Sequence, residues 1–302
     1  MRSTTTLMKN WQFTGPDGNT TTVDLPHTWN NIDGQDGGND YWRGSCTYRT
    51  HFAAPAFDPA AQQVWLQFEG VGDSAKVSLN GTEVASHDGG FSTFRADITA
   101  LLQADNELTV VADNSKNDTV YPQKADFTFY GGIYRTVSLL VVSRDHIALD
   151  YYGGPGVQIT PTVNGSSAEI RVETKVNGGG SVEVAILDAE GREVLAGSGM
   201  DTTLTLDRPH LWDGVRDPYL YTCVVRLMKD GQAMDEVRQR FGVRSFSVDA
   251  KQGFFLNGRP YPLHGVSRHQ DRKGLGNAIT REMHDEDMQL IKEMGANTIR
   301  LA

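Results

Sequence analysis

Residues 76–81 read Lys76-Val77-Ser78-Leu79-Asn80-Gly81, and this short stretch indicates what kind of fold to expect. The first four residues are typical of a strand. Asn80-Gly81 favours a tight hairpin turn, because both residue types tolerate positive φ angles. We therefore expect an antiparallel hairpin here.

Similar short strands surround this hairpin on both sides. Residues 64–68, 107–111 and 134–142 each read as a strand, and Gly, Asn and Asp separate them. No long helical period is present between Trp11 and about Ser143. The pattern predicts a β-sandwich with a jelly-roll-like layout for residues 1–143.

A second β-rich segment is expected over residues 144–246. Residues 167–173 and 181–186 alternate polar and apolar side chains, as strands with one wet face should. Asn177-Gly178-Gly179-Gly180 supplies the turn between them. About seven short strands in roughly 100 residues indicate an immunoglobulin-like sandwich.

Residues 247–302 follow a different pattern. A hairpin around Asn257-Gly258 precedes two short apolar stretches, residues 263–266 and 297–301, which read as buried strands. Residues 284–294 between them predict a helix, with Asp285 to Asp287 in its first turn and Gly295 at its end. Strand, helix and strand make one βαβ unit, which cannot close a sheet by itself. We therefore expect the chain to be truncated.

Composition narrows the class of partner. The formal net charge of -10 leaves no basic face for nucleic acid, whereas neutral sugars need none. Cys46 and Cys223 lie far apart, which favours two buried free thiols over a disulfide. No apolar leader region and no apolar stretch near about 18 residues is present, so we expect a cytoplasmic protein without a membrane partner.

Several motifs in a fixed order carry a resemblance to a known family. They are Leu25-Pro26-His27-Thr28-Trp29, His87-Asp88-Gly89-Gly90-Phe91, Gly131-Gly132-Ile133-Tyr134-Arg135, Gly265-Val266-Ser267-Arg268-His269-Gln270-Asp271 and Ala296-Asn297-Thr298-Ile299-Arg300. Together they resemble glycoside hydrolase family 2. The family's order of domains is a sugar-binding sandwich, an immunoglobulin-like sandwich and a (β/α)8 barrel. The resemblance therefore implies that residues 247–302 begin such a barrel.

The resemblance also implies an activity. It suggests a retaining β-glycosidase, β-galactosidase-like, which removes a terminal β-linked sugar through a covalent glycosyl-enzyme intermediate. β-Glucuronidase of the same family is the alternative, as is a carbohydrate-binding or scaffold protein without a catalytic barrel. Retaining glycosidases use two carboxyl groups about 5–5.5 Å apart. By resemblance both are glutamates on later barrel strands, beyond Ala302. Oligomeric state stays open, with a homo-oligomer as one alternative.

Asp126 and Arg300 are the strongest candidate site residues. Asp126 matches the aspartate that reaches from the family's first domain into the sugar pocket, where a carboxylate accepts strong hydrogen bonds from sugar hydroxyls. The alternative is an ordinary turn cap. Arg300 lies at the end of the second barrel strand, and by resemblance it orients the nucleophilic glutamate. A structural salt bridge is the alternative.

Four weaker candidates for substrate binding remain. Arg268 and His269 follow the first barrel strand and either line the pocket or hold the barrel entrance together. Asn39 and Asp40 lie in a polar, aromatic-containing loop over residues 33–44, where the alternative is a glycine-rich turn with Trp42 anchored in the core.

No metal-ligand spacing is evident, so we expect no cofactor. Binding of a Mg or Na ion would follow from the family resemblance alone, since some members of the family use these ions. The pairs His87-Asp88 and His284-Asp285 are isolated in the sequence and are interpreted as structural, and the acidic run Asp285 to Asp287 as solvated.

Overall fold

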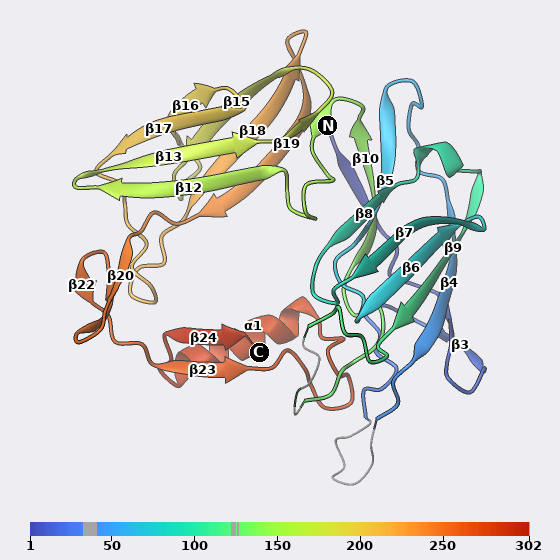
Figure 1. The fold of residues 1–302 in the computed structure, drawn as a ribbon. Coiled ribbons are helices and arrows are strands. Elements are labelled where there is room, and N and C mark those ends of the chain that lie inside the picture. The colour runs from blue at the N-terminus through green and yellow to red at the C-terminus, as the bar shows by residue number, and fades with distance from the viewer. Residues whose placement is uncertain (33–40, 122–124, 126, 302) are drawn as a thin grey trace. The chain divides into compact units, whose positions relative to one another are not determined.

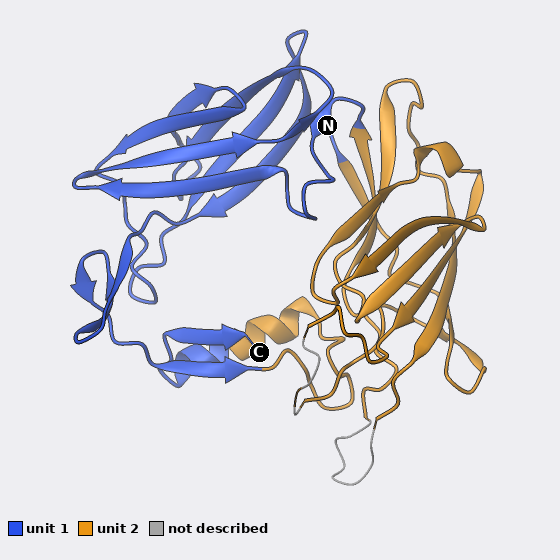
Figure 2. Cartoon of the chain, in the orientation of Figure 1, with its two compact units in different colours: residues 1–2, 143–268, 289–302 blue, residues 3–142, 269–288 orange. Residues whose placement is uncertain are grey.

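The computed structural model describes residues 1–32, 41–121, 125 and 127–301, which form two compact units (Figures 1 and 2). One unit comprises residues 1–2, 143–268 and 289–302, and the other comprises residues 3–142 and 269–288. The chain is mainly β, with two sandwiches followed by the start of a barrel, so the predicted fold class is confirmed. No helix among the described residues has the length and apolar character needed to span a membrane.

Residues 3–142 form the first sandwich. One sheet has six strands, which are β2 (Trp11–Thr14), β3 (Thr20–Val23), β4 (Ser45–Ala53), β6 (Ser74–Leu79), β7 (Thr82–Asp88) and β9 (Asp105–Asp113). Its spatial order is β3-β2-β4-β9-β6-β7. The other sheet contains β1 (Ser3–Thr6), β5 (Gln62–Phe68), β8 (Phe94–Asp97) and β10 (Val137–Ser143), in the order β1-β10-β5-β8. A single 3-10 turn, η1 (Thr99–Leu101), precedes β9.

Alternation along the strands builds the core of this sandwich. In β4 the side chains of Cys46, Tyr48, Thr50 and Phe52 are buried and their neighbours point outward. The hairpin predicted at residues 76–81 is confirmed, because Leu79 pairs with Thr82 and the φ angles of Asn80 and Gly81 are 50° and 81°.

The second sandwich has seven main strands, as the pattern predicts. One sheet contains β12 (Val157–Asn164), β13 (Ser167–Thr174) and β17 (Asp201–Asp207). The other contains β15 (Ser181–Leu187), β16 (Glu193–Ser198), β18 (Tyr221–Lys229) and β19 (Gln232–Phe241). Two short strands, β11 (His146–Ile147) and β14 (Val176–Asn177), pair with each other. Cys223 belongs to this core and Cys46 to the other, both as free thiols, and burial raises the pKa of each thiol to about 12.

The turn at residues 177–180 connects two sheets and does not form a hairpin. Strand β13 pairs with β12 and β17, whereas β15 pairs with β16 and β18. Both strands alternate in the same way, so the pattern along the chain leaves their partners undetermined. The packing of the two sheets decides that the chain crosses between them here.

The last part of the chain contains the predicted βαβ unit. A small sheet of β20 (Phe246–Asp249), β21 (Gly253–Leu256) and β22 (Arg259–Pro260) precedes it. The unit then comprises β23 (Gly265–Arg268), α1 (Arg281–Glu293) and β24 (Thr298–Leu301), and β23 pairs with β24 in parallel.

Two details of this unit differ from the prediction. Helix α1 begins at Arg281, so the acidic residue of its first turn is Glu282, and Asp285 to Asp287 follow in the second turn. The two strands are largely half-buried or exposed, and only Arg268 is buried. The physical reason is that each strand of a two-stranded sheet has one neighbour only.

Candidate functional site

Three predicted site residues fall in parts of the sequence outside the described residues. They are Asp126, Asn39 and Asp40. Their proposed contacts with a sugar stay predictions. The residues that follow Asp126 in sequence are described, and they define the local geometry. We call residues 127–131 the Phe129 segment.

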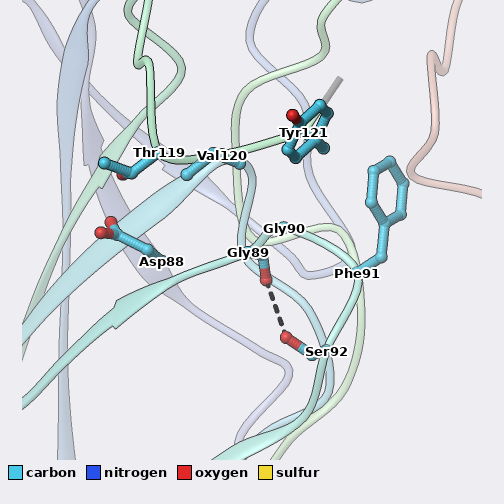
Figure 3. Close-up of a pocket in the computed structure, with 8 residues that line it drawn as sticks. All are labelled: Asp88, Gly89, Gly90, Phe91, Ser92, Thr119, Val120 and Tyr121. Atoms are coloured by element: carbon cyan, nitrogen blue, oxygen red, sulfur yellow. Dashed lines mark hydrogen bonds between the residues drawn. The ribbon is translucent and has the colours of Figure 1, made fainter. Parts of the chain in front are cut away.

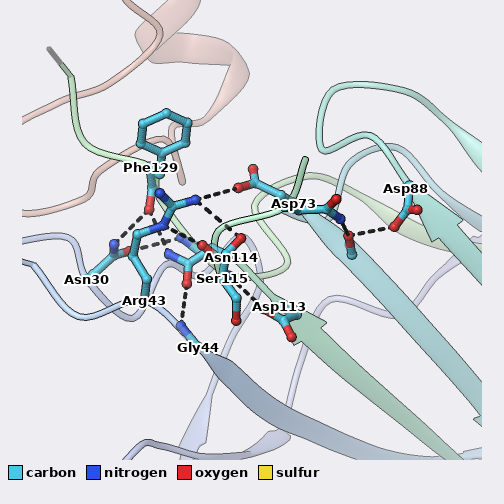
Figure 4. A network of polar contacts seen from close by, with 12 residues as sticks. Asn30, Arg43, Gly44, Asp73, Asp88, Asp113, Asn114, Ser115 and Phe129 are labelled. Carbon is cyan, nitrogen blue, oxygen red and sulfur yellow. Dashed lines mark hydrogen bonds and ion pairs between the residues drawn. The ribbon is translucent and has the colours of Figure 1, made fainter. Parts of the chain in front are cut away.

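Two buried asparagines hold the Phe129 segment in place (Figure 4). The side-chain amides of Asn30 and Asn114 donate to the carbonyl oxygen of Phe129 at 2.9 and 2.7 Å. Their amide oxygens accept hydrogen bonds from the backbone N–H groups of Gly131 and Gly44, respectively. Both asparagine side chains are fully buried. A buried amide that uses both its donor and its acceptor fixes backbone position strongly, because any displacement leaves a polar group unpaired.

Arg43 is the charged member of this network (Figure 4). Its Nε donates to the Asn114 carbonyl oxygen at 2.6 Å, and its guanidinium lies 4.3 Å from the centroid of the Phe129 ring. The same guanidinium lies 3.8 Å from the Asp73 carboxylate. Arg43 therefore links the end of β9 to the Phe129 segment through hydrogen bonding and a cation–π contact.

Asp73 is a carboxyl group with a raised pKa inside this network. Burial raises its pKa to about 6, and the neighbouring Asp113 carboxylate acts in the same direction. The Arg43 guanidinium lowers the pKa, but at 3.8 Å it offsets only part of the loss of hydration. The contact with Arg43 is therefore not enough to keep this carboxyl at its ordinary acidity.

Residues 269–277 of the same unit pack against the Phe129 segment. The Tyr130 hydroxyl donates to the Asp271 carboxylate at 3.1 Å. The rings of Phe127 and His269 meet edge to face, with centroids 5.5 Å apart. The structure thus brings His269, one of the predicted site residues, next to the residue that follows Asp126 in sequence.

Arg268 and Arg300 lie on the two paired strands β23 and β24. Arg300 pairs with Ser267, and Arg268 pairs with Leu301. Because side chains alternate between faces along a strand, the Arg268 and Arg300 side chains leave opposite faces of this small sheet. Arg268 is buried, with 7% of its surface exposed, whereas Arg300 is exposed. The register therefore separates these two predicted site residues.

Sequence reasoning missed Asn30, Arg43 and Asn114 as organisers of the segment next to Asp126. No motif marks them, because their shared partner Phe129 lies 99 and 15 residues from the two asparagines. Trp42 packs edge to face on Trp29, with ring centroids 6.1 Å apart, but 38% of its surface is exposed, so it is not anchored in the core as the alternative for that loop had it. In the part of the chain that the structure describes, no cluster of three or more His, Cys, Asp or Glu side chains could hold a metal ion.

Three family models match the chain in sequence order. The glycosyl hydrolase 2 galactose-binding domain-like model matches residues 35–132. The glycosyl hydrolases family 2 model matches residues 155–244, and the TIM barrel domain of that family matches residues 247–302.

Relatives and solved structures agree with these matches. A β-glucuronidase of Bacteroides fragilis is 37% identical over 98% of this chain and 46% of its own length. The crystal structure of an FMN-binding β-glucuronidase from Faecalibacterium prausnitzii L2-6 has a TM-score of 0.96 at 42% identity, and covers 100% of this chain and 48% of that one. The crystal structure of a putative β-galactosidase from Bacteroides fragilis has a TM-score of 0.94 at 40% identity. The match covers 100% of this chain and 50% of that one. The chain thus spans about half the length of these proteins.

Proposed function

Because this chain belongs to glycoside hydrolase family 2, we propose that the whole protein hydrolyses terminal β-linked glycosides, β-glucuronides ahead of β-galactosides. The observation that carries this proposal is the run of three family domains in sequence order over residues 35–302. The relatives named above include both activities, and the β-glucuronidases among them support the reversal of our first expectation, which was a β-galactosidase.

The proposed reaction divides its chemistry between this chain and the rest of the protein. A retaining glycosidase needs one carboxyl group as acid and base and a second as nucleophile. We place both outside this chain, on later strands of the barrel. Asp126 would accept hydrogen bonds from sugar hydroxyls, and Arg300 would keep the nucleophile ionised and oriented through its planar guanidinium.

The substrate is tested by comparing three chromogenic glycosides with the full-length protein. We expect a higher kcat/KM for the β-glucuronide than for the β-galactoside or the β-mannoside. Preference for the galactoside would restore the first expectation. Binding of sugar without cleavage of any of the three glycosides would instead support the carbohydrate-binding or scaffold alternative.

Asp126→Ala tests the reach of the first domain into the sugar site. We expect kcat/KM to fall at least about a hundredfold, because two hydrogen bonds to a charged group contribute about 1.5–3 kcal/mol each. The matched control is Asp105→Ala, because the Asp105 side chain is 75% exposed and belongs to the same unit. Surface ion pairs contribute little, so this variant should keep kcat/KM within roughly twofold of the unmodified protein. Equal activity of the two variants would exclude Asp126 from the site.

Other expectations remain proposals for the whole protein. We propose that it needs no cofactor, and the visible absorption spectrum of the purified protein is the direct check, because one structural relative is described as FMN-binding. Bound flavin would overturn that proposal. Cytoplasmic location and a homo-oligomeric state are likewise proposals, to be checked by cell fractionation and by light scattering.

A further inference from the structure

The chain contains four Asn-Gly pairs, and the structure holds their asparagine side chains in different ways. The pairs are Asn80-Gly81, Asn164-Gly165, Asn177-Gly178 and Asn257-Gly258. An asparagine that precedes glycine is chemically reactive, because glycine has no side chain to keep its backbone nitrogen away from the neighbouring side-chain amide. The contacts of each side chain therefore decide which pair can react in the folded protein.

Asn80 is held by both halves of its side-chain amide. Its nitrogen donates to the Leu101 carbonyl oxygen and to the Asn106 side-chain oxygen, in both cases at 3.0 Å. Its oxygen accepts from the Glu107 N–H group at 2.9 Å. A reaction at this side chain would have to break all of these hydrogen bonds, which protects Asn80.

Asn257 and Asn177 are also held by hydrogen bonds. The Asn257 nitrogen donates to the Trp212 carbonyl oxygen, and its oxygen accepts from the Ser245 N–H group, in both cases at 3.0 Å. The Asn177 nitrogen donates to the Asp150 carboxylate at 3.1 Å, and Asn177 is half-buried. Both asparagines are therefore protected in the folded protein.

Asn164 is the exposed member of the set. It ends strand β12, and a turn of two exposed residues leads from it into β13, the strand beside β12 in Figure 1. Within the part of the chain that the structure describes, neither its side-chain amide nor the Gly165 N–H group has a hydrogen-bond partner. Strand β12 is also the edge of its sheet, so a single neighbouring strand holds this end. The tip of the hairpin can therefore open at little cost.

We propose that Asn164 is a site of spontaneous deamidation in the folded protein. The Gly165 nitrogen forms a bond to the Asn164 Cγ, and the bond from Cγ to Nδ2 breaks. The departing nitrogen takes the Gly165 proton and leaves as ammonia. Water then opens the cyclic succinimide, at Cγ to give aspartate or at the main-chain carbonyl carbon to give isoaspartate. Each event consumes a water molecule and releases an ammonia molecule.

Both products change the end of the β12–β13 hairpin. Each adds a negative charge at an exposed position, and isoaspartate also places an additional carbon atom in the main chain. The pairing of Asn164 with Ser167 closes this hairpin, so the added atom disturbs the last pair of the ladder first. The modification is independent of the hydrolysis proposed above, so either proposal can fail without the other.

Ageing of the full-length protein in heavy-oxygen water, followed by peptide mass spectrometry, tests this inference. A tryptic digest in ordinary water places each Asn-Gly pair in its own peptide, and the heavy oxygen marks conversion that occurred during ageing. We expect Asn164 to convert at least about tenfold faster than the other three asparagines, because each of those must first break a hydrogen bond. The rate should rise with pH, since the Gly165 nitrogen has to lose its proton. An isoaspartyl methyltransferase identifies isoaspartate in the same peptide.

Asn164→Gln is the matched variant, because it keeps an exposed side-chain amide whose additional methylene group disfavours ring closure. Its peptide should stay unconverted. Ageing in urea is the second control, and the four asparagines of the unfolded protein should convert at similar rates. The proposal is overturned if Asn164 in the folded protein converts no faster than the other three, or if Asn164→Gln converts equally fast. It is also overturned if the four rates differ as much in urea as in the folded protein.

Discussion

At the scale of single residues, Asn30 shows how one buried side chain fixes a segment 100 residues away. Its amide donates to the Phe129 carbonyl oxygen and accepts from the Gly131 N–H group. Without Asn30 the Gly131 N–H group would lose this partner at a buried position, whereas the Phe129 carbonyl oxygen would keep only its hydrogen bond from the Asn114 amide. Asn30 therefore matters for the position of the residues that follow Asp126 more than for the hydrophobic core.

We predict that Asn30→Ala loosens the Phe129 segment locally. Loss of a buried hydrogen bond costs about 1–3 kcal/mol, so amide exchange of Gly131 should accelerate roughly ten- to a hundredfold. Hydrogen-exchange mass spectrometry of peptides covering residues 127–135 measures this. Asn164→Ala, at an exposed strand end of the other sandwich, is the control and should leave these peptides unchanged. Unchanged exchange in Asn30→Ala as well would contradict the role given to this amide.

Asp73 provides a pH-dependent prediction at the same scale. Its pKa is about 6 in the folded protein, compared with an ordinary 3.8, so between about pH 4 and 6 the folded state holds a proton that the unfolded state has released. Stability contributed by this group therefore falls as pH rises through that window. Asp73→Asn removes the effect. Its free energy of unfolding relative to the unmodified protein should rise by about 2 kcal/mol between pH 4 and 7.

The quantity to measure is the difference in free energy of unfolding between Asp73→Asn and the unmodified protein. The titration of His27 changes the stability of both proteins in the opposite direction. Burial lowers the pKa of His27 to about 4, so its contribution to stability rises with pH over a similar window. His27 is present in both proteins, and its effect cancels in the difference. Urea unfolding followed by tryptophan fluorescence at several pH values gives both curves. If the difference in free energy of unfolding does not change with pH, Asp73 has an ordinary pKa in the folded protein.

At the scale of structural elements, two glycines with positive φ have different tasks. Gly81 ends the β6–β7 hairpin at φ +81°, and a Cβ there would meet open space. Gly132 has φ +142°, and a Cβ there would lie 2.2 Å from the His27 carbonyl oxygen. The first glycine is needed for the turn alone, and the second for the close approach of two backbone segments inside the sandwich.

We predict a large difference between the two alanine substitutions. Gly81→Ala should cost about 1 kcal/mol, the usual cost of a left-handed conformation for alanine. Gly132→Ala should cost more than about 3 kcal/mol, because the backbone has to move as well. Thermal unfolding midpoints of the two variants compare them directly. Midpoints within a degree or two of each other would mean that the segment around Gly132 adapts easily.

At the scale of the whole molecule, the chain contains one βαβ unit of a barrel. Strands β23 and β24 form a two-stranded parallel sheet, and the exposed side chains around them include Met288, Leu290 and Leu301, which are 38%, 56% and 66% exposed. A barrel of eight strands assembles its site from loops after several strands. We therefore predict that the purified 302-residue chain does not hydrolyse chromogenic β-glycosides.

The matched measurement is the activity of the full-length protein on the same glycosides. Turnover by the full-length protein and none by the 302-residue chain is the expected pair of results. Measurable turnover by the short chain at a comparable rate would show that two carboxyl groups within residues 1–302 perform the reaction.

Much of the fold could be predicted because it depends on neighbours in sequence. The hairpins at Asn80-Gly81 and Asn257-Gly258 follow from two residues each, and both pairs have positive φ angles in the structure. Strand positions follow from alternation over a few residues, and the parallel pairing of β23 with β24 follows from strand, helix and strand in succession. Helix α1 begins at Arg281, three residues before the predicted start, because acidic side chains such as Asp285 occur within a helix as well as in its first turn.

The sequence by itself determined the fold class, the two sandwiches, the family resemblance and the free, buried cysteines, because each depends on composition or on short-range pattern. The tertiary structure alone decided that residues 177–180 cross between sheets, that Asn30, Arg43 and Asn114 converge on Phe129, and that Phe91 and Tyr121 line one depression of the first sandwich (Figure 3). The physical reason is that a sandwich brings together residues far apart in the chain. No local pattern records which of them will meet.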